Sequence, residues 1–442
     1  MSTYLIRGAN LLGEEKTDIL IKDSIIGAVG PSLDAGDATV INADGLIALP
    51  GLVDPHTHLR EPGREDAETV LTGTQAAAAG GYTCVNAMPN TTPVQDSAGV
   101  VEQVLRLGRE AGYCDVRPIG AVTHGLEGKH LAELGAMASS EAQVRCFSDD
   151  GLCVSDSMLM RRALEYVKSF GGVVAQHAQD PRLTEDAQMN EGVVSAEIGL
   201  AGWPAVAEES IVIRDCLLAQ HVGSRVHELH LSTQGSVELI RWAKSQGMPV
   251  TAEATPHHLS LDDEEARSYD PRFKVNPPLR TRADVEALRQ GVADGTIDVI
   301  GTDHAPHPAE DKDCEWAAGA NGMIGLETAL PVVVEALVDT GMITWSDIAR
   351  LMSYAPAKLC QNPDQGLPIE EGNPANICLY DPTIEWTVSG ADSHSKASNT
   401  PWEGRTLRGK VSYTFYRGVP TLWEGELRTK EDIATEEKEN TK

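Results

Sequence analysis

Two histidines, His56 and His58, are separated by one residue in the segment DPHTH. In an extended strand, residues i and i+2 point to the same side, so both imidazoles can be directed at one cation. Imidazole nitrogen is a preferred ligand of Zn²⁺ and of similar divalent metals. The pair alone is a weak signal, because two histidines in an exposed loop give the same pattern.

Four further segments carry histidine or aspartate directly after a short apolar run. They are CFSDDG with Asp149 and Asp150, VVAQHAQD with His177, LHLST with His230, and IGTDHAPH with Asp303, His304 and His307. If each run is a strand, five strand ends offer imidazole or carboxylate groups. Such a combination predicts a divalent-metal site built from residues that are far apart in the sequence.

These groups follow apolar runs that alternate with amphipathic helical segments, a pattern typical of parallel strands linked by helices. The expected strands lie at 51–55, 82–87, 116–122, 144–147, 173–176, 226–231, 249–254 and 298–301. The helical segments lie at 67–79, 100–111, 157–170, 210–221, 236–246 and 283–293. Eight such strands predict an α/β fold, the (β/α)8 or TIM barrel, whose active sites lie at the C-terminal ends of the strands.

Both ends of the chain have a different texture, in which short β-like runs alternate with turn residues. We expect the two ends to pair into one small β-sandwich domain. The expected boundaries are 1–50 for its N-terminal part, 51–360 for the metal-dependent catalytic barrel and 361–429 for its C-terminal part. Residues 430–442 are charged and almost free of apolar side chains, which predicts a disordered tail.

The composition argues against several classes of partner. The chain has 36 Lys and Arg against 66 Asp and Glu, a net charge of −30, which disfavours nucleic acid and anionic membranes. It shows neither an apolar stretch of about 18 residues nor a signal peptide. Its eight cysteines are dispersed without a CxxC pair, as in proteins with reduced thiols. We therefore expect a cytoplasmic protein.

Taken together, these segments resemble the dihydroorotases of the longer bacterial type, in the amidohydrolase superfamily. The resemblance is carried by PGLVDPHTHLREPG, AAAAGGYTCVNAMPNTTP, FSDDG, KVNPPLR and GTDHAPH, which occur in the family's order. It runs from about residue 4 to residue 425. It implies the reversible cyclisation of N-carbamoyl-L-aspartate to (S)-dihydroorotate and water, in de novo pyrimidine (UMP) biosynthesis.

The resemblance also implies a metal centre with two Zn²⁺ per subunit, bridged by an aspartate and a hydroxide. The implied ligands are His56 and His58 for the first metal, His177 and His230 for the second, Asp150 for both and Asp303 for the first. Many relatives bridge their metals with a carboxylated lysine, which FSDDG does not offer. The choice of Asp150 over Asp149 rests on the resemblance, because chemistry alone does not rank adjacent carboxylates.

The reaction explains why such residues are needed. Two metals about 3.5–4 Å apart can share a hydroxide, lower the pKa of water to roughly 7 and polarise the carbonyl of a cyclic amide. The leaving ureido nitrogen requires a proton, and therefore a general acid/base beside the attacking oxygen. The resemblance gives this role to Asp303.

A ring that carries a carboxylate also requires a fixed positive charge. Arg60, two residues after His58, projects to the same side if the strand continues, and a guanidinium binds carboxylate with two hydrogen bonds. A surface arginine is the alternative. The resemblance adds contacts to the carboxylate and to the ring's carbonyl and N–H edge. The full expected substrate-binding set is His58, Arg60, Asn90, Asn276, His307, Asn321 and Gly322.

Three features have two interpretations each. The polar segment 308–321 after the last strand is either a lid over the substrate or an ordinary surface loop. His257 and His258, at another strand end, either reach the site or make structural hydrogen bonds. The metal is zinc, cobalt or manganese by ligand chemistry, since all three accept nitrogen and oxygen ligands.

Two other functions stay open. Another cyclic amidohydrolase, allantoinase or hydantoinase, would act on similar rings, but Arg60, Asn90 and the missing lysine favour a carboxylated ring. A non-catalytic scaffold for aspartate carbamoyltransferase would be free to lose metal ligands, whereas all six positions are filled here. The family leads us to expect a homodimer, and an association with aspartate carbamoyltransferase remains open.

Overall fold

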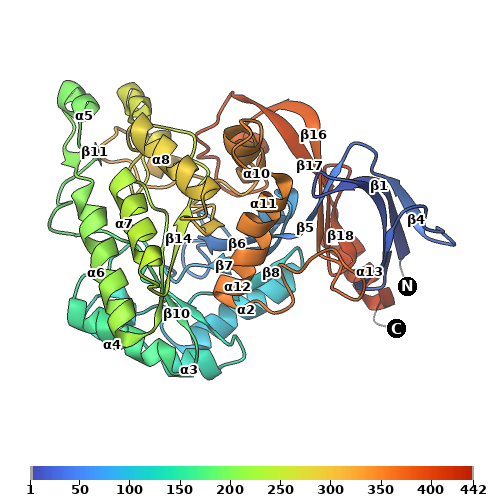
Figure 1. The fold of residues 1–442 in the computed structure, drawn as a ribbon, viewed down its shortest axis with the longest axis horizontal. Coiled ribbons are helices and arrows are strands. Elements are labelled where there is room, and N and C mark those ends of the chain that lie inside the picture. Colours follow the sequence, from blue (N-terminus) through green and yellow to red (C-terminus); the bar gives the residue numbers. More distant parts are fainter. Residues whose placement is uncertain (1–2, 441–442) are drawn as a thin grey trace.

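A closed barrel of eight short parallel strands forms the centre of the molecule (Figure 1). The computed structural model describes residues 3–440. The barrel strands are β6 (Leu52–Thr57), β7 (Tyr82–Ala87), β8 (Asp115–Pro118), β9 (Cys146–Phe147), β10 (Val173–Gln176), β13 (Arg225–Glu228), β14 (Val250–Ala254) and β15 (Val299–Ile300). Parallel bridges between Gly120 and Phe147 and between Thr57 and His304 join the three-stranded and five-stranded runs. The predicted TIM barrel is confirmed.

Helices cover the outside of the barrel, which explains why nearly all residues of its strands are buried. They include α1 (Val70–Ala79), α2 (Ala98–Ala111), α4 (Ser157–Lys168), α6 (Val206–Val222), α7 (Gln234–Ser245) and α8 (Arg282–Ala293). Several start at a side chain that caps the first turn, as Asp156 does for α4 and Thr233 for α7. The capped helices fix the lengths of the loops that carry polar groups to the barrel's C-terminal edge.

The chain makes one longer excursion between β10 and α6. It contains the two-stranded pair β11 (Met189–Asn190) and β12 (Gly202–Trp203) and the short helix α5 (Val193–Ile198). These elements lie at the far edge of the barrel from the terminal sheet (Figure 1). Their sequence carries no sustained periodicity, so the pattern of apolar residues does not predict them.

Strands from both ends of the chain form one nine-stranded sheet beside the barrel. They are β1 (Thr3–Leu11), β2 (Lys16–Lys22), β3 (Ile25–Gly30), β4 (Thr39–Asn42), β5 (Ile47–Pro50), β16 (Ile377–Thr387), β17 (Thr406–Tyr416), β18 (Val419–Trp423) and β19 (Glu426–Leu427). The two ends meet where β5 pairs antiparallel with β16. Tyr4 on β1 packs against Phe415 and Trp423 although their strands are not neighbours in the sheet. The sheet therefore curls over itself, as the predicted sandwich requires.

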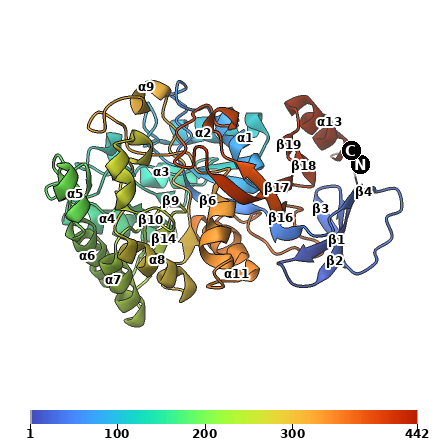
Figure 2. The same cartoon turned by 90° about the horizontal axis from the view of Figure 1, so that it is seen from above.

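The end of the chain differs from the prediction. Where the composition predicts a disordered tail at 430–442, the structure has helix α13 (Lys430–Asn440), beside β18 in both views (Figures 1 and 2). Ile433 is 3% exposed and joins a cluster with Ala78 and Val419. Glu436 accepts a hydrogen bond from Tyr4 and pairs with Arg428 at 2.5 Å. One buried apolar residue, Ile433, and the contacts of Glu436 dock this helix, which composition alone does not show. Residues 441–442 lie outside the described chain.

None of the helices in residues 3–440 combines the length and apolar composition needed to cross a lipid bilayer.

Candidate functional site

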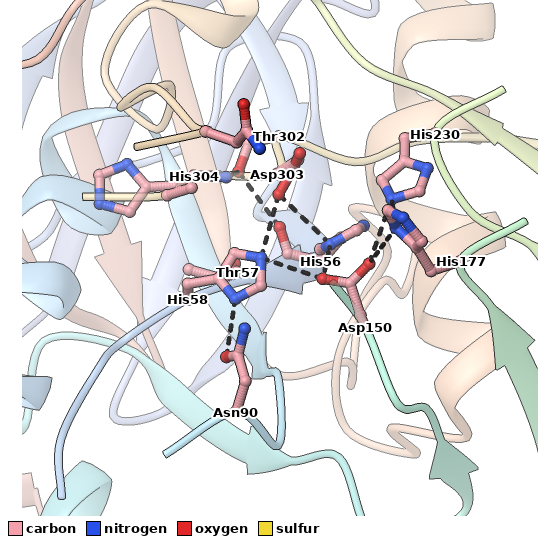
Figure 3. Close-up of polar contacts among 12 residues, drawn as sticks. His56, Thr57, His58, Asn90, Asp150, His177, His230, Thr302, Asp303 and His304 are labelled. Atoms are coloured by element: carbon pink, nitrogen blue, oxygen red, sulfur yellow. Dashed lines mark hydrogen bonds and ion pairs between the residues drawn. The ribbon is translucent and has the colours of Figure 1, made fainter. Parts of the chain in front are cut away.

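Six polar side chains from five barrel strands meet at the C-terminal edge of the barrel (Figure 3). They lie on or within three residues of the ends of β6, β9, β10, β13 and β15, and they are His56, His58, Asp150, His177, His230 and Asp303. All six are at most 5% exposed. The structure thus brings together all six residues that the resemblance implied as metal ligands.

Asp150 lies between two groups of histidines. Its Oδ2 is 3.3 Å from Nε2 of both His56 and His58. Its Oδ1 is 3.2 Å from His177 Nδ1 and 3.1 Å from His230 Nε2. Each carboxylate oxygen thus faces a different pair of imidazoles, which is the arrangement of a carboxylate shared by two cations.

Asp303 completes the first group. Its Oδ1 lies 3.0 Å from His58 Nε2 and 3.4 Å from His56 Nε2. Burial opposes ionisation of this carboxyl, but His56 and His58 outweigh burial and hold its pKa below the ordinary value. Asp303 is therefore an anion at neutral pH and a potential proton acceptor.

The cluster fits divalent metal ions because several of its nitrogen atoms lack a suitable hydrogen-bond donor or acceptor. His56 Nε2 is fully buried and has no hydrogen-bond partner. His177 Nδ1 and His230 Nε2 face each other at 2.8 Å, so a proton or a cation must lie between these two nitrogens and Asp150. Nearby carboxylates raise the pKa of His56 well above its usual range despite its burial, which shows that the site attracts positive charge. Imidazole and carboxylate ligands in this number suit zinc or a similar metal.

Outer hydrogen bonds orient the first pair of histidines. His56 Nδ1 is 2.8 Å from Glu253 Oε1, and His58 Nδ1 is 2.9 Å from Asn90 Oδ1. Because both partners are acceptors, the two Nδ1 atoms carry protons, and both Nε2 atoms face the site, where each could give its lone pair to a bound cation. Burial disfavours charge on Glu253, but His56 and His227 lower its pKa to about 2, so it is ionised.

The two adjacent aspartates of FSDDG have separate roles. Asp149 accepts hydrogen bonds from the backbone of Val122 and Thr123 at 2.8 and 2.9 Å and from the Thr123 hydroxyl. It therefore ties the β9 loop to the end of the preceding strand. Asp150 alone faces the histidines, which separates two carboxylates that sequence chemistry left unranked.

Three residues of the site have left-handed backbone conformations that side chains rarely adopt. They are Arg60 with φ 61°, His230 with φ 28° and Asp303 with φ 47°. Such strain persists only where surrounding contacts enforce it, and it concentrates at functional sites. Arg60 lines the cavity at this edge of the barrel, and His230 and Asp303 belong to the cluster.

A cavity of about 210 Å³ opens beside the cluster. Its lining contains all seven residues expected to bind substrate, His58, Arg60, Asn90, Asn276, His307, Asn321 and Gly322. Asp150 and Asp303 form part of the same wall. A small ring in this cavity would therefore touch both the cluster and the groups expected to recognise it.

Arg60 supplies positive charge to this cavity. Its Nε donates to Pro306 O at 3.1 Å, and one terminal nitrogen lies 3.4 Å from His307 Nε2. Burial lowers the pKa of Arg60 to about 10, so the guanidinium remains charged at neutral pH. Burial and Arg60 lower the pKa of His307 to about 3, so its ring is neutral and donates from Nε2 to Asn321 O at 2.8 Å.

Asn90 and Asn276 use their amides differently. Asn90 lends its oxygen to His58, so only its amide nitrogen is left for a ligand. Asn276 donates its nitrogen to Gln179 Oε1 at 3.2 Å, while its own Oδ1 is buried without a partner. The cavity therefore offers a donor at Asn90 and an acceptor at Asn276.

The segment after β15 is held in place by buried lysines. Lys312 Nζ donates to three backbone carbonyls, those of Pro271, Lys274 and Ala320, at 2.6–3.1 Å. Lys274 donates in turn to the carbonyls of Trp316 and Ala317 at 2.9 and 3.2 Å. These bonds fix the backbone on which Asn321 and Gly322 lie.

A residue outside the barrel also supports the cavity. Asn399, between β16 and β17, donates to Ala305 O and Gly322 O at 3.1 and 3.2 Å and accepts from His307 N at 3.1 Å. The sequence gives no signal for Asn399, Glu253, Gln179 or Lys312. Each acts through contacts between segments that are distant in the chain.

Two of the remaining histidines near the site, His258 and His304, make structural hydrogen bonds. His258 lies 2.7 Å from the Thr255 hydroxyl and donates to Pro277 O at 3.0 Å. His257 Nε2 is buried without a partner near the cluster, and its ring does not line the cavity. His304 accepts from the backbone of Gly325 and Leu326 and points away from the cluster (Figure 3).

Comparison with known proteins places the chain in a family. The Dihydro-orotase-like family model matches residues 45–236. The chain is 65% identical to the dihydroorotase of Streptomyces coelicolor, over 97% of this chain and 100% of the relative. It is 62% identical to that of Leifsonia xyli, over 96% and 97% of the two chains, and 54% identical to that of Mycobacterium tuberculosis, over 96% and 100%.

Solved structures support the same fold. The L-hydantoinase (dihydropyrimidinase) from Arthrobacter aurescens superposes with a TM-score of 0.85 at 24% identity, covering 97% of this chain and 98% of that one. The dihydropyrimidinase from Brevibacillus agri gives a TM-score of 0.82 at 24% identity, covering 96% of both. These neighbours establish the fold of the barrel and its terminal sheet. The three dihydroorotases are 54–65% identical to this chain over nearly its full length. This chain therefore belongs to the dihydroorotase family.

Proposed function

We propose that this chain is a dihydroorotase, which interconverts N-carbamoyl-L-aspartate and (S)-dihydroorotate in pyrimidine biosynthesis. The observation that carries the proposal is the cavity that a charged arginine, Arg60, lines together with Asp150 and Asp303 of the cluster. A cyclic amide with a ring carboxylate matches both the cluster and the arginine. The identity of 54–65% to three curated dihydroorotases supports the same reaction.

We also propose that the cluster holds two Zn²⁺ ions. His56, His58 and Asp303 would hold one, His177 and His230 the other, with Asp150 shared by both. When bound, the two metals acidify water and polarise the amide carbonyl. The protein holds both sites rigid, because every ligand lies at the end of a buried barrel strand.

Asp303 is proposed as the general acid/base. Its carboxylate is ionised and lies beside His56 and His58, so it can take the proton of the attacking water. The same oxygen can then deliver that proton to the ring nitrogen as the C–N bond breaks. In the cyclising direction, Asp303 removes the proton from the carbamoyl nitrogen as it attacks the carboxyl carbon, and it returns this proton to the carboxyl oxygen that leaves as water when the C–O bond breaks.

Other residues of the cavity lining are proposed to hold the substrate. Arg60 is proposed to bind the ring carboxylate, with Asn90 and His307 beside it. Asn276 Oδ1 is an acceptor for a ring N–H, and the backbone of Asn321 and Gly322 faces the other ring edge. His58 borders both the substrate and the first metal position.

Assembly and location are further parts of the proposal. We propose a homodimer, as the family resemblance implies, and a cytoplasmic enzyme, in keeping with eight cysteines that form no disulfide. Association with aspartate carbamoyltransferase is a further proposal. Light scattering of the purified chain tests the dimer, and co-elution with the transcarbamoylase of the same organism tests the association.

A second candidate is a hydantoinase, because the structural neighbour from Arthrobacter aurescens, with a TM-score of 0.85, carries that name. Against it stand Arg60 in the cavity and the shared aspartate, where many cyclic amidohydrolases use a carboxylated lysine.

A spectrophotometric assay separates the candidates. Purified, zinc-supplemented protein is incubated with L-dihydroorotate, hydantoin and allantoin under one set of conditions, with and without chelator. The proposal predicts selective turnover of dihydroorotate that the chelator abolishes. Turnover of a neutral ring without dihydroorotate hydrolysis would move the function to hydantoinase or allantoinase, and silence on all three with metal bound would favour the scaffold.

A further inference from the structure

We infer that Gln179 is a positioning residue that sets, with one amide oxygen, both a metal ligand and a substrate contact. Gln179 Oε1 lies 2.8 Å from His177 Nε2 and 3.2 Å from Asn276 Nδ2. His177 belongs to the metal cluster and Asn276 lines the cavity. The inference rests on the proposed function and adds a connection between its two halves.

The orientation of the Gln179 amide is determined by Thr184. Gln179 Nε2 donates to Thr184 Oγ1 at 2.7 Å, and the Thr184 hydroxyl donates its single proton to Asp180 O at 3.0 Å. A hydroxyl has one proton, so Thr184 can only accept from Gln179. The amide nitrogen must therefore face Thr184, which is 8% exposed, and the amide oxygen must face His177 and Asn276.

This orientation fixes the tautomer of His177. Gln179 Oε1 is only an acceptor, so His177 Nε2 carries the ring proton. The other nitrogen, Nδ1, then presents its lone pair toward Asp150 Oδ1 and His230 Nε2, which lie at 3.2 and 2.8 Å. A histidine binds a metal through the nitrogen without a proton, so Gln179 readies His177 as a ligand.

The same oxygen fixes the amide of Asn276. Because Asn276 donates its nitrogen to Gln179, it presents its oxygen to the cavity, and this Oδ1 is buried without a partner. A buried acceptor without a partner favours a ligand that brings a donor. The hydrogen-bonded pair of Thr184 and Gln179 therefore selects a ring N–H beside Asn276 Oδ1. It disfavours a ring carbonyl or ring oxygen there.

Substitutions at residue 179 separate this role from packing. Gln179→Met keeps the volume and removes the acceptor, so zinc affinity of one site should fall tenfold or more and KM for dihydroorotate should rise about tenfold. Gln179→Glu keeps an acceptor for both partners and should stay within threefold of wild type in both. Zinc affinity is read by competition with a chromogenic chelator on metal-free protein, independently of turnover.

A double-mutant cycle between Thr184 and Gln179 tests the orientation of the Gln179 amide. Thr184→Val removes the group that holds the amide, so Gln179 can turn and zinc affinity should fall severalfold. In the Gln179→Glu background the same Thr184→Val change should have no effect, because a carboxylate presents an oxygen whichever way it turns. Asn276→Leu is the matched control: it should raise KM and leave zinc affinity unchanged.

The outcomes are distinct. Wild-type zinc affinity in Gln179→Met, or equal losses in Gln179→Met and Gln179→Glu, would overturn the inference, as would a Thr184→Val effect that persists in the Gln179→Glu background. If Gln179→Met does not fold, the Thr184→Val cycle decides alone. If wild-type protein binds zinc but leaves dihydroorotate intact, the proposed function fails, while the zinc titrations still decide whether Gln179 prepares His177.

Discussion

At the scale of single residues, the site depends on which atom of each side chain faces inward. Asp150 turns one oxygen to His56 and His58 and the other to His177 and His230. Its neighbour Asp149 instead accepts hydrogen bonds from the backbone of Val122 and Thr123. The sequence predicts the residue types at the strand ends, but the assignment of individual oxygens and nitrogens depends on partners elsewhere in the chain.

Asp303→Asn tests the proton-transfer role at this scale. The asparagine keeps an oxygen toward His56 and His58 but cannot take a proton, so kcat should fall at least about a hundredfold, within the 10²–10⁴ range of general acid/base catalysis. Zinc content, measured by atomic emission, should stay at the wild-type value. Near-normal kcat in the asparagine variant would remove Asp303 from the mechanism.

Arg60→Met tests recognition of the carboxylate. The guanidinium is held by Pro306 and stands in the cavity, and a methionine of similar length removes its charge. The variant should lose about a hundredfold or more in kcat/KM on dihydroorotate, because a hydrogen bond to a charged group is worth about 1.5–3 kcal/mol and Arg60 can make two. Any residual turnover of hydantoin serves as the control, and an equal loss on both rings would show that Arg60 is structural.

At the scale of elements, the barrel could be predicted because buried strands appear as short apolar runs, whereas the helices between them show apolar residues repeating about every 3.6 positions. The expected strands 82–87 and 173–176 coincide with β7 and β10. β13 ends at Glu228, earlier than expected, because the chain turns at His230 into a left-handed conformation. No local pattern reports that turn, nor the contacts by which Asn399 and Lys312 shape the cavity, because both depend on packing between distant segments.

Lys312→Met tests whether the buried Lys312, whose Nζ binds three backbone carbonyls, holds the segment after β15 in place. The test uses the pH dependence of the free energy of unfolding. Burial, aided by the charge of Lys274, lowers the pKa of Lys312 from 10.5 to about 7, against the nearby Asp270, Cys314 and Asp311. From pH 7 to 10.5 the unfolded chain therefore holds a proton that the folded chain has released. In this window wild-type stability should rise with pH relative to the variant, by at most about 1.4 kcal/mol per pH unit.

Urea unfolding of metal-free wild type and Lys312→Met at pH 7 and pH 9 measures this difference. Below pH 7 both states are protonated, so the two curves should run parallel there. If the free energies of unfolding of the two proteins run parallel across the whole pH range, Lys312 titrates normally and is not a buried residue that holds the segment.

At the scale of the whole molecule, the cluster ties the barrel together. Its six side chains come from five strands that span 248 positions from His56 to Asp303 (303 − 56 + 1). The terminal sheet completes the unit, since β5 and β16, one from each end of the chain, pair beside the barrel (Figure 1). Metal binding should therefore stabilise the barrel as a whole rather than one loop.

Chelation tests this coupling. A ligand that binds only the folded state at about 1,000 times its Kd stabilises it by about 4 kcal/mol. Zinc-loaded protein should therefore lose several degrees in Tm on chelation in calorimetry. His230→Ala, which removes one ligand from the second group, should show a smaller loss. Identical Tm values with and without chelator would mean that the cluster binds no metal tightly.

The most direct measurement is a crystal structure of zinc-loaded Asp303→Asn with dihydroorotate, with data collected at the zinc absorption edge. The account predicts two anomalous peaks on either side of Asp150, the substrate carboxylate on Arg60, and a ring N–H on Asn276 Oδ1. A single peak, a metal held away from Asp150, or a substrate carboxylate turned away from Arg60 would contradict it.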